Sequence, residues 1–180
     1  METSENIHTM DLTGQSHQNN TFIQKVVKLK LPIIQYPITS GYRVKGKQWD
    51  HHFDDIKGIW SNYKTDAGIG EHDGYDFTCP IGTKIQSCIE GKILKLGYEN
   101  PDNYNQGFGL RIIQIFNQNK EEWLLYYGHL SNISVIKGEE VKINQYIANS
   151  GNTGHSTAAH LHIEVRNGKT LQQHPITWVL

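Results

Sequence analysis

Two histidines separated by one residue, His160 and His162, lie in an apolar run rich in β-branched residues. Such a run predicts a β-strand, in which alternate side chains point to the same face of the sheet. The two imidazoles would then lie side by side, and the opposite face would carry Leu161, Ile163 and Val165. A pair of this kind is either a metal ligand with a neighbouring imidazole or two unrelated surface histidines, so other residues must decide its role.

Two further places in the chain offer side chains of the same chemistry. His72 and Asp76 are four residues apart, with Gly74 between them. Because glycine lets the backbone curl, the imidazole and the carboxylate can converge. His129 follows a predicted strand and Gly128. Taken singly, each place is better explained by a loop histidine or a turn aspartate, and only their combination indicates a site.

A zinc site combines these residues. Catalytic zinc takes three protein ligands from histidine and carboxylate side chains and leaves one position for water. The chain supplies His72, Asp76 and one of the pair His160 and His162. The other member of the pair and His129 would be unliganded imidazoles, a side chain whose ordinary pKa near neutrality suits proton transfer or charge stabilisation. Spacing alone does not say which of His160 and His162 binds the metal.

The two cysteines do not add to this site. Cys79 and Cys88 flank a predicted turn at Pro80-Ile81-Gly82, and a disulfide or two separate half-buried thiols would both fit their spacing. Two thiols without C-x-x-C spacing exclude a cysteine-rich zinc site. The chain has ten histidines, so histidine and carboxylate side chains would hold any metal.

The elements that must position these residues are mostly strands. The 180-residue length fits one domain, with a flexible polar tail at residues 1–20 and the folded domain at residues 21–180. Runs of isoleucine, valine and tyrosine broken by glycine and asparagine favour a mainly β fold, and no long amphipathic helix is visible. Strands are predicted at residues 76–79, 84–89, 91–96, 110–116, 122–127 and 160–165, the fourth and fifth forming a hairpin.

Other stretches predict edges, turns and loops. One or two edge strands are expected in residues 22–38, where Pro32 and Pro37 limit sheet pairing. Residues 39–43 predict a turn, and residues 44–71, which show no sustained period, predict a long loop. Residues 81–85 and 137–141 each enter a strand through a glycine-led turn, which suggests a weak internal duplication.

Three motifs occur in a fixed order and carry a family resemblance. They are His72-x-Gly-x-Asp76, Tyr127-Gly128-His129-Leu130, and a glycine-rich stretch at residues 150–154 that leads to His160-Leu161-His162-x-Glu164. Together they resemble the lysostaphin/LytM-type zinc endopeptidases, which cut peptidoglycan peptides. The resemblance covers roughly residues 29–178 and includes the Pro80-x-Gly82-Thr83 turn.

The resemblance implies a fold, a cofactor and an activity. The fold is the duplicated hybrid motif, with antiparallel β-sheets that form a groove, and the activity is hydrolysis of an amide bond in the peptide stem or cross-bridge of peptidoglycan. A single Zn²⁺ would be bound by His72, Asp76 and His162. His129 and His160 would be the catalytic imidazoles, one taking the proton of the water and one or both stabilising the oxyanion. Which histidine does which stays open.

Residues around the motifs give further expectations. Glu164 shares a strand face with the two histidines, so it either orients an imidazole or is an ordinary exposed glutamate. Family members often carry Gly-Pro before the H-L-H sequence, where this chain has Ala158-Ala159, so the loop entering the strand need not follow the family's path. Four aromatic residues are either groove walls or exposed loop aromatics. They are Trp60, Tyr63, Tyr104 and Phe108.

Charge and hydropathy limit which partners the protein can bind and where it can act. The net charge of −1 and the pI near 6.8 argue against nucleic-acid binding, which needs a basic surface. No apolar run approaches the about 20 residues of a membrane span, and residues 1–20 contain no signal-peptide apolar region. Two explanations are therefore expected. Either this sequence omits a signal or anchor, or the protein leaves its cell by another route such as lysis. A monomer acting in the cell envelope or outside the cell is expected.

Two other functions fit parts of the sequence. A non-catalytic cell-wall-binding or amidase-activating domain on the same fold would lose some ligands, whereas this chain keeps all five residues of the site. A lipoyl- or biotinyl-like carrier domain, suggested by the repeated turns, would need an exposed lysine in a suitable motif at a hairpin tip. The sequence contains no such motif.

Overall fold

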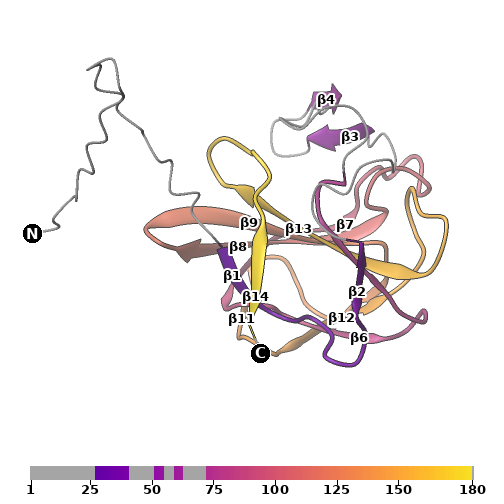
Figure 1. Ribbon diagram of the computed structural model, residues 1–180. Helices are drawn as coiled ribbons and strands as arrows, with labels where there is room; N and C mark the ends of the chain where they lie inside the picture. Colours follow the sequence, from indigo (N-terminus) through magenta and orange to yellow (C-terminus); the bar gives the residue numbers. More distant parts are fainter. Residues whose placement is uncertain (1–26, 41–50, 55–58, 63–71, 180) are drawn as a thin grey trace, which may run out of the picture.

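The computed structural model describes residues 27–40, 51–54, 59–62 and 72–179 (Figure 1). These residues form fourteen β-strands and no helix, which confirms the predicted mainly β fold. Within the same residues, no helix is long and apolar enough to cross a membrane. The tail predicted at residues 1–20 lies outside the described residues.

Seven strands form one antiparallel sheet in the spatial order β11-β7-β8-β9-β13-β5-β2. Its members are β2 (Ile38–Ser40), β5 (Tyr75–Thr78), β7 (Gly91–Tyr98), β8 (Leu110–Gln118), β9 (Glu121–Gly128), β11 (Glu140–Val141) and β13 (His160–Asn167). β8 and β9 form the predicted hairpin. Its two turn residues, Asn119 and Lys120, have φ angles of 55° and 61°, as the type I′ turns that favour hairpins require.

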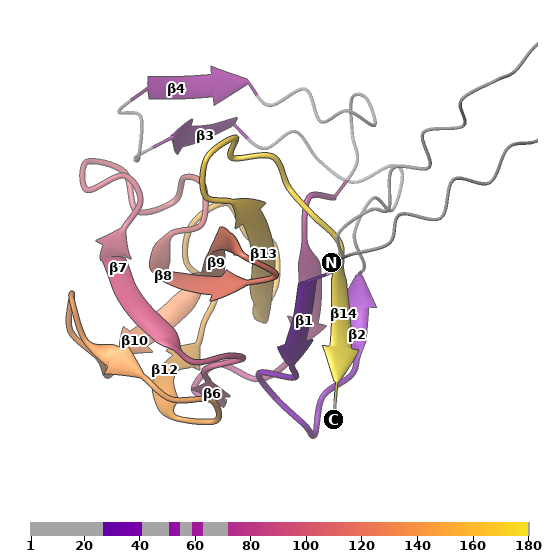
Figure 2. The ribbon, with the colours of Figure 1, turned by 90° about the vertical axis from the view of Figure 1, so that its left-hand side faces the viewer.

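The other strands form three smaller units. β6 (Lys84–Gln86), β10 (Leu130–Ile133) and β12 (Tyr146–Ser150) make a three-stranded antiparallel sheet. β1 (Val27–Lys30) pairs in parallel with β14 (Ile176–Val179), and β3 (His51–Asp54) pairs with β4 (Ile59–Asn62). Figure 2 shows β6, β10 and β12 gathered at one end of the long strands, with β1 and β14 beside β2.

The main hydrophobic core packs against one face of the seven-stranded sheet. Leu161, Ile163 and Val165 of β13 belong to this core and are at most 1% exposed. A smaller apolar cluster contains Phe108, Ile113, Leu124, Tyr126 and Leu171. Because side chains alternate along a strand, His160 and His162 lie on the face away from the main core, as the sequence predicts.

The two glycine-led turns share a backbone conformation. Gly82 and Gly138 have φ angles of 90° and 86°, a region that favours glycine. In each turn the amide one residue later donates to a carbonyl three residues back, at 3.2 Å. The similarity between residues 81–85 and 137–141 therefore extends from sequence to geometry, although β6 and β11 belong to different sheets.

Two predictions about the N-terminal half were wrong. The predicted turn at residues 39–43 begins inside β2, where Ile38 and Ser40 pair with residues of β5. The predicted loop at residues 44–71 contains β3 and β4. Each of these two strands has four residues, too few for a periodic pattern to stand out in the sequence. β6 is also shorter than predicted and ends at Gln86.

The structure decides several alternatives about side chains. Cys79 and Cys88 are free and buried, so they form no disulfide. Burial raises the pKa of the Cys88 thiol to about 12.

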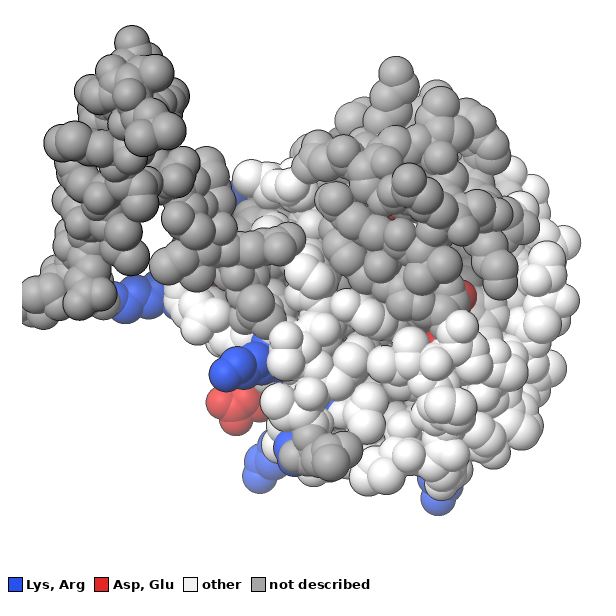
Figure 3. All heavy atoms as spheres, in the orientation of Figure 1, with Lys and Arg blue, Asp and Glu red and all other residues white. Residues whose placement is uncertain are grey.

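Tyr104 is 56% exposed, but Phe108 is 5% exposed and is not an open groove wall. Tyr63 and the side chain of Trp60 lie outside the described residues. On the described part of the face in Figure 3, lysine and arginine side chains are scattered rather than gathered into a patch.

Candidate metal centre

The register of the central strands places the predicted residues together. β13 lies between β5 and β9, and His162 pairs with Asp76 on one side and with Gly128 on the other. His160, two residues earlier, pairs with Thr78. His129 directly follows the last residue of β9, so the sheet alone brings four of the five predicted residues to one place.

Gly74 allows the fifth residue, His72, to reach this place. A Cβ atom on Gly74 would lie 2.4 Å from the Ile163 carbonyl oxygen and 2.6 Å from His162 Nε2. Any other residue at this position would push the segment away from β13. The glycine in the His-x-Gly-x-Asp motif is therefore required for close approach, which gives the predicted convergence of His72 and Asp76 its structural reason.

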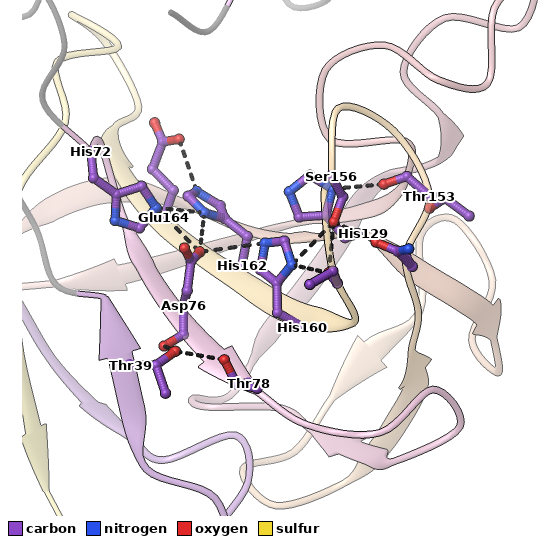
Figure 4. A network of polar contacts seen from close by, with 12 residues as sticks. Thr39, His72, Asp76, Thr78, His129, Thr153, Ser156, His160, His162 and Glu164 are labelled. Atoms are coloured by element: carbon purple, nitrogen blue, oxygen red, sulfur yellow. Dashed lines mark hydrogen bonds and ion pairs between the residues drawn. The ribbon is translucent and has the colours of Figure 1, made fainter. Parts of the chain in front are cut away.

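Three donor atoms converge in the left half of Figure 4. His72 Nε2 lies 3.2 Å from both His162 Nδ1 and Asp76 Oδ1, and His162 Nδ1 lies 2.9 Å from Asp76 Oδ1. Zinc binds such atoms at about 2.0–2.1 Å, so two ligands of a tetrahedral site stand about 3.3 Å apart. The triangle of donors therefore fits one Zn²⁺. The side chains are 11%, 24% and 6% exposed for His72, Asp76 and His162, which leaves an opening to solvent at Asp76.

The electrostatics of the three donors suit a cation. Burial disfavours the Asp76 carboxylate, but hydrogen bonds and charges of His162 and His72 outweigh burial and hold its pKa well below the ordinary value. Burial likewise disfavours the His162 cation, yet the hydrogen bond to Asp76 and the negative charges of Asp76 and Glu164 raise the pKa of His162 to about 10. The site thus keeps a carboxylate ionised and stabilises positive charge beside it, and a divalent cation at His162 Nδ1 would take the place of that proton.

His129 is fixed by backbone contacts on both sides. Its φ angle is 58°, and its amide donates to the Phe108 carbonyl oxygen at 2.7 Å. Its ring Nδ1 lies 2.8 Å from the Thr153 carbonyl oxygen, which can only accept, so Nδ1 carries a proton and Nε2 is left as an acceptor. Burial and the positive charges at His162 and His160 lower the pKa of His129 to about 3, so the ring is neutral at pH 7.

His160 stands between His129 and the donor triangle. Its Nδ1 lies 2.8 Å from the Ala158 carbonyl oxygen and 3.2 Å from Ser156 Oγ. Its Nε2 points the other way and is 3.6 Å from Asp76 Oδ1. The rings of His129 and His160 are 4.5 Å apart between centroids. The two imidazoles therefore lie next to each other, to one side of the three donors (Figure 4).

The sequence did not foresee the groups that hold these rings. Thr153 and Ala158 contact the rings through backbone carbonyls, which any residue supplies, so residue type does not show which carbonyl meets which ring. Phe108 packs beneath the imidazoles, with its ring centroid 5.4 Å from that of His162 and 6.5 Å from that of His129. Its position after Gly107 in a polar loop gave no signal of burial.

A model of peptidase family M23 matches residues 70–175, a range that contains all five predicted site residues. Among curated relatives, glycyl-glycine endopeptidase ALE-1 from Staphylococcus capitis is 34% identical over 113 residues, which cover 58% of this chain and 29% of that protein. Peptidoglycan DD-endopeptidase ShyA from Vibrio cholerae is 28% identical over 156 residues, which cover 86% of this chain and 32% of that protein. The chain thus spans about a third of the length of these relatives.

Two solved structures share the fold. The catalytic domain of the antimicrobial peptidase lysostaphin from Staphylococcus simulans is 30% identical, with a TM-score of 0.52, and the match covers 74% of this chain and 88% of that one. A zinc-containing peptidase from Vibrio cholerae is 26% identical, with a TM-score of 0.58, and the match covers 96% of this chain and 44% of that one.

Proposed function

Because the chain belongs to peptidase family M23, we propose that it is a zinc-dependent endopeptidase that hydrolyses amide bonds in peptidoglycan, in the peptide stem or the cross-bridge. Membership of the family agrees with the predicted resemblance to lysostaphin/LytM-type peptidases. The observation that carries the proposal is the complete constellation in one place. Three donor atoms lie 2.9–3.2 Å from one another, and two further imidazoles lie beside them.

In this proposal His72, Asp76 and His162 hold the metal. Their geometry supports the assignment because the three facing atoms match the ligand spacing of tetrahedral zinc. His129 and His160 each turn Nδ1 to a backbone carbonyl, so each keeps Nε2 for chemistry. Within the described residues, His72, Asp76 and His162 are the one group of three or more histidine, cysteine or carboxylate side chains close enough to hold a metal ion.

The proposed mechanism divides the work between the imidazoles. A bound zinc ion supplies a Lewis acid that polarises the scissile carbonyl and lowers the pKa of the attacking water. His129 accepts the proton of that water at Nε2, since the Thr153 carbonyl keeps the ring's own proton on Nδ1. His160, whose Nε2 points toward Asp76, stabilises the oxyanion as it forms by donating from Nε2. Because the Ala158 carbonyl holds one proton on Nδ1, this role requires the imidazolium form of His160.

The substrate class rests on relatives. One relative is described as a glycyl-glycine endopeptidase and another as a peptidoglycan DD-endopeptidase. These names support peptidoglycan peptides as the substrate class, but they refer to different bonds. The same relatives support action in the cell envelope or outside the cell, and we propose that the protein acts there as a monomer. A non-catalytic wall-binding domain is disfavoured, because a domain without turnover would not need both the donor triangle and two fixed imidazoles.

Mass spectrometry of digested cell walls tests the proposal and identifies the bond. The zinc-loaded protein is incubated with two purified walls, one with glycine cross-bridges and one with direct cross-links between stems. Fragments from the first wall alone would indicate cleavage in the cross-bridge, and fragments from both would indicate cleavage of the stem. Zinc-loaded protein that releases fragments from neither wall, nor from soluble stem or bridge peptides, would overturn the proposal.

A further inference from the structure

Three side chains of β13 form a continuous polar row on the face that carries the site. His162, Glu164 and Arg166 alternate with the core residues of the strand, so they point the same way. The Glu164 side chain is 0% exposed and that of Arg166 is 2% exposed. Glu164 Oε1 accepts from Arg166 Nε at 2.5 Å. Burying a carboxylate and a guanidinium this completely carries a large desolvation penalty. We therefore expect the pair to have a role beyond stabilising the strand.

The row ends at the ring nitrogen of His162 that faces away from the metal-binding triangle. His162 Nε2 lies 3.6 Å from Glu164 Oε2, while Nδ1 faces His72 and Asp76. An imidazole can bind a metal through Nδ1 only when that nitrogen is unprotonated. In the neutral ring the proton must then be on Nε2, and the carboxylate of Glu164 is placed to attract it there.

Arg166 fixes the carboxylate in turn. Its guanidinium carbon lies 4.6 Å from the ring centroid of Tyr126 and 5.9 Å from that of Phe108, so it is packed against two aromatic rings. With Oε1 engaged by Arg166, the other oxygen of Glu164 is directed at His162. The positive charge of Arg166 also compensates the buried carboxylate, which would otherwise carry an uncompensated charge next to the site.

We propose that Glu164 and Arg166 are positioning residues that select the Nε2-protonated tautomer of His162 and aim its Nδ1 at the metal. Arg166 acts through Glu164, and Glu164 acts through His162, so neither touches substrate. The inference rests on the proposed function, since it assigns His162 as a zinc ligand. Glu164 and Arg166 determine how tightly zinc binds, whereas the proposed function concerns whether zinc binds at all.

Zinc affinity of the full chain, measured by competition with a chromogenic chelator, tests the inference. Glu164→Gln keeps the shape of the side chain but removes its charge, and zinc affinity is expected to fall about 10- to 100-fold. Arg166→Lys keeps the charge but loses the planar fork, and a smaller loss is expected. The matched control is Glu140→Gln, because Glu140 is 74% exposed and pairs only loosely with Lys92 at 3.8 Å. This control should bind zinc like the wild type.

A spectroscopic measurement on the wild type keeps the test independent of folding in the variants. Long-range ¹H–¹⁵N spectra of the zinc-loaded protein are expected to show the proton of His162 on Nε2. A proton on Nδ1, or a Glu164→Gln variant that binds zinc as tightly as the wild type, would overturn the inference. A wild-type chain that binds no zinc would instead refute the proposed function, so the two failures are distinguishable.

Discussion

His162 on β13 lies directly opposite Asp76 on β5, and the two side chains meet at 2.9 Å between Nδ1 and Oδ1. The antiparallel register creates this contact. If β13 slipped by one residue, Leu161 or Ile163 would face Asp76, and both histidines would turn toward the main core. The hydrophobic alternation that makes β13 a strand therefore also sets the geometry of the site.

Substitution of Asp76 by asparagine tests the central donor. Asp76→Asn keeps the shape of the side chain but removes the negative charge that faces two imidazoles. Zinc affinity is expected to fall by more than the about 100-fold that a residue outside the ligand set can cost. Competition with a chelator measures the loss. Asp102→Asn, at an exposed turn, is the control and should leave the affinity unchanged. Equal affinities in the two variants would contradict the assignment of Asp76 as a ligand.

The sequence predicted which side chains converge better than it predicted the groups that support them, because the two depend on different signals. The period of two along β13 fixes which side chains share a face, and the choice of histidine and aspartate reflects metal chemistry. Both signals are local and carried by residue type. The positions of His129 and His160 instead depend on carbonyl oxygens of Thr153 and Ala158, and residue type does not show where a backbone carbonyl points.

The fold shows the same division. The hairpin of β8 and β9 has long strands with continuous apolar runs and a two-residue turn, so its sequence pattern predicts it. β3 and β4 have four residues each and no repeated period, so they were mistaken for a loop. Short strands are decided by the pairing they find in the folded chain, which the sequence does not display.

Gly74→Ala is expected to disturb the site and the fold together. The new Cβ would lie 2.4 Å from the Ile163 carbonyl oxygen and 2.6 Å from His162 Nε2, so β13 and residues 72–76 must separate. Overpacking of this kind costs about 1–3 kcal/mol of unfolding free energy, and zinc affinity should fall with it. Thermal denaturation and zinc titration measure the two effects.

Gly82→Ala is the control for this substitution. Gly82 has a φ angle of 90° with open space around it, so alanine there costs about 1–2 kcal/mol through backbone strain alone. This variant should lose stability and keep its zinc affinity. If Gly74→Ala also kept the wild-type affinity, close approach of the His72 segment would not be needed for the metal site.

Alanine substitutions at two histidines should separate metal binding from turnover. His162→Ala removes a donor and is expected to abolish tight zinc binding. His129→Ala should leave zinc in place, because His129 is outside the donor triangle, and should reduce turnover by about 10²- to 10⁴-fold, as expected for loss of a general base. Zinc content by elemental analysis and release of wall fragments measure the two properties. Equal zinc loss in both variants would show that the ligands are assigned wrongly.

Thr153→Val tests whether the loop that holds His129 matters for turnover. The Thr153 hydroxyl accepts from the Leu110 amide at 3.0 Å and donates to the Leu130 carbonyl at 2.8 Å, which fixes the carbonyl that binds His129. Valine keeps the shape but leaves two backbone groups unpaired, at a cost of about 1–3 kcal/mol in unfolding free energy. A misplaced His129 should lower turnover up to about 100-fold while zinc affinity stays unchanged.

Thr170→Val, at an exposed hydroxyl 3.3 Å from the Gln172 amide, is the matched control and should change neither property. Wild-type turnover in folded Thr153→Val would mean that His129 needs no such support.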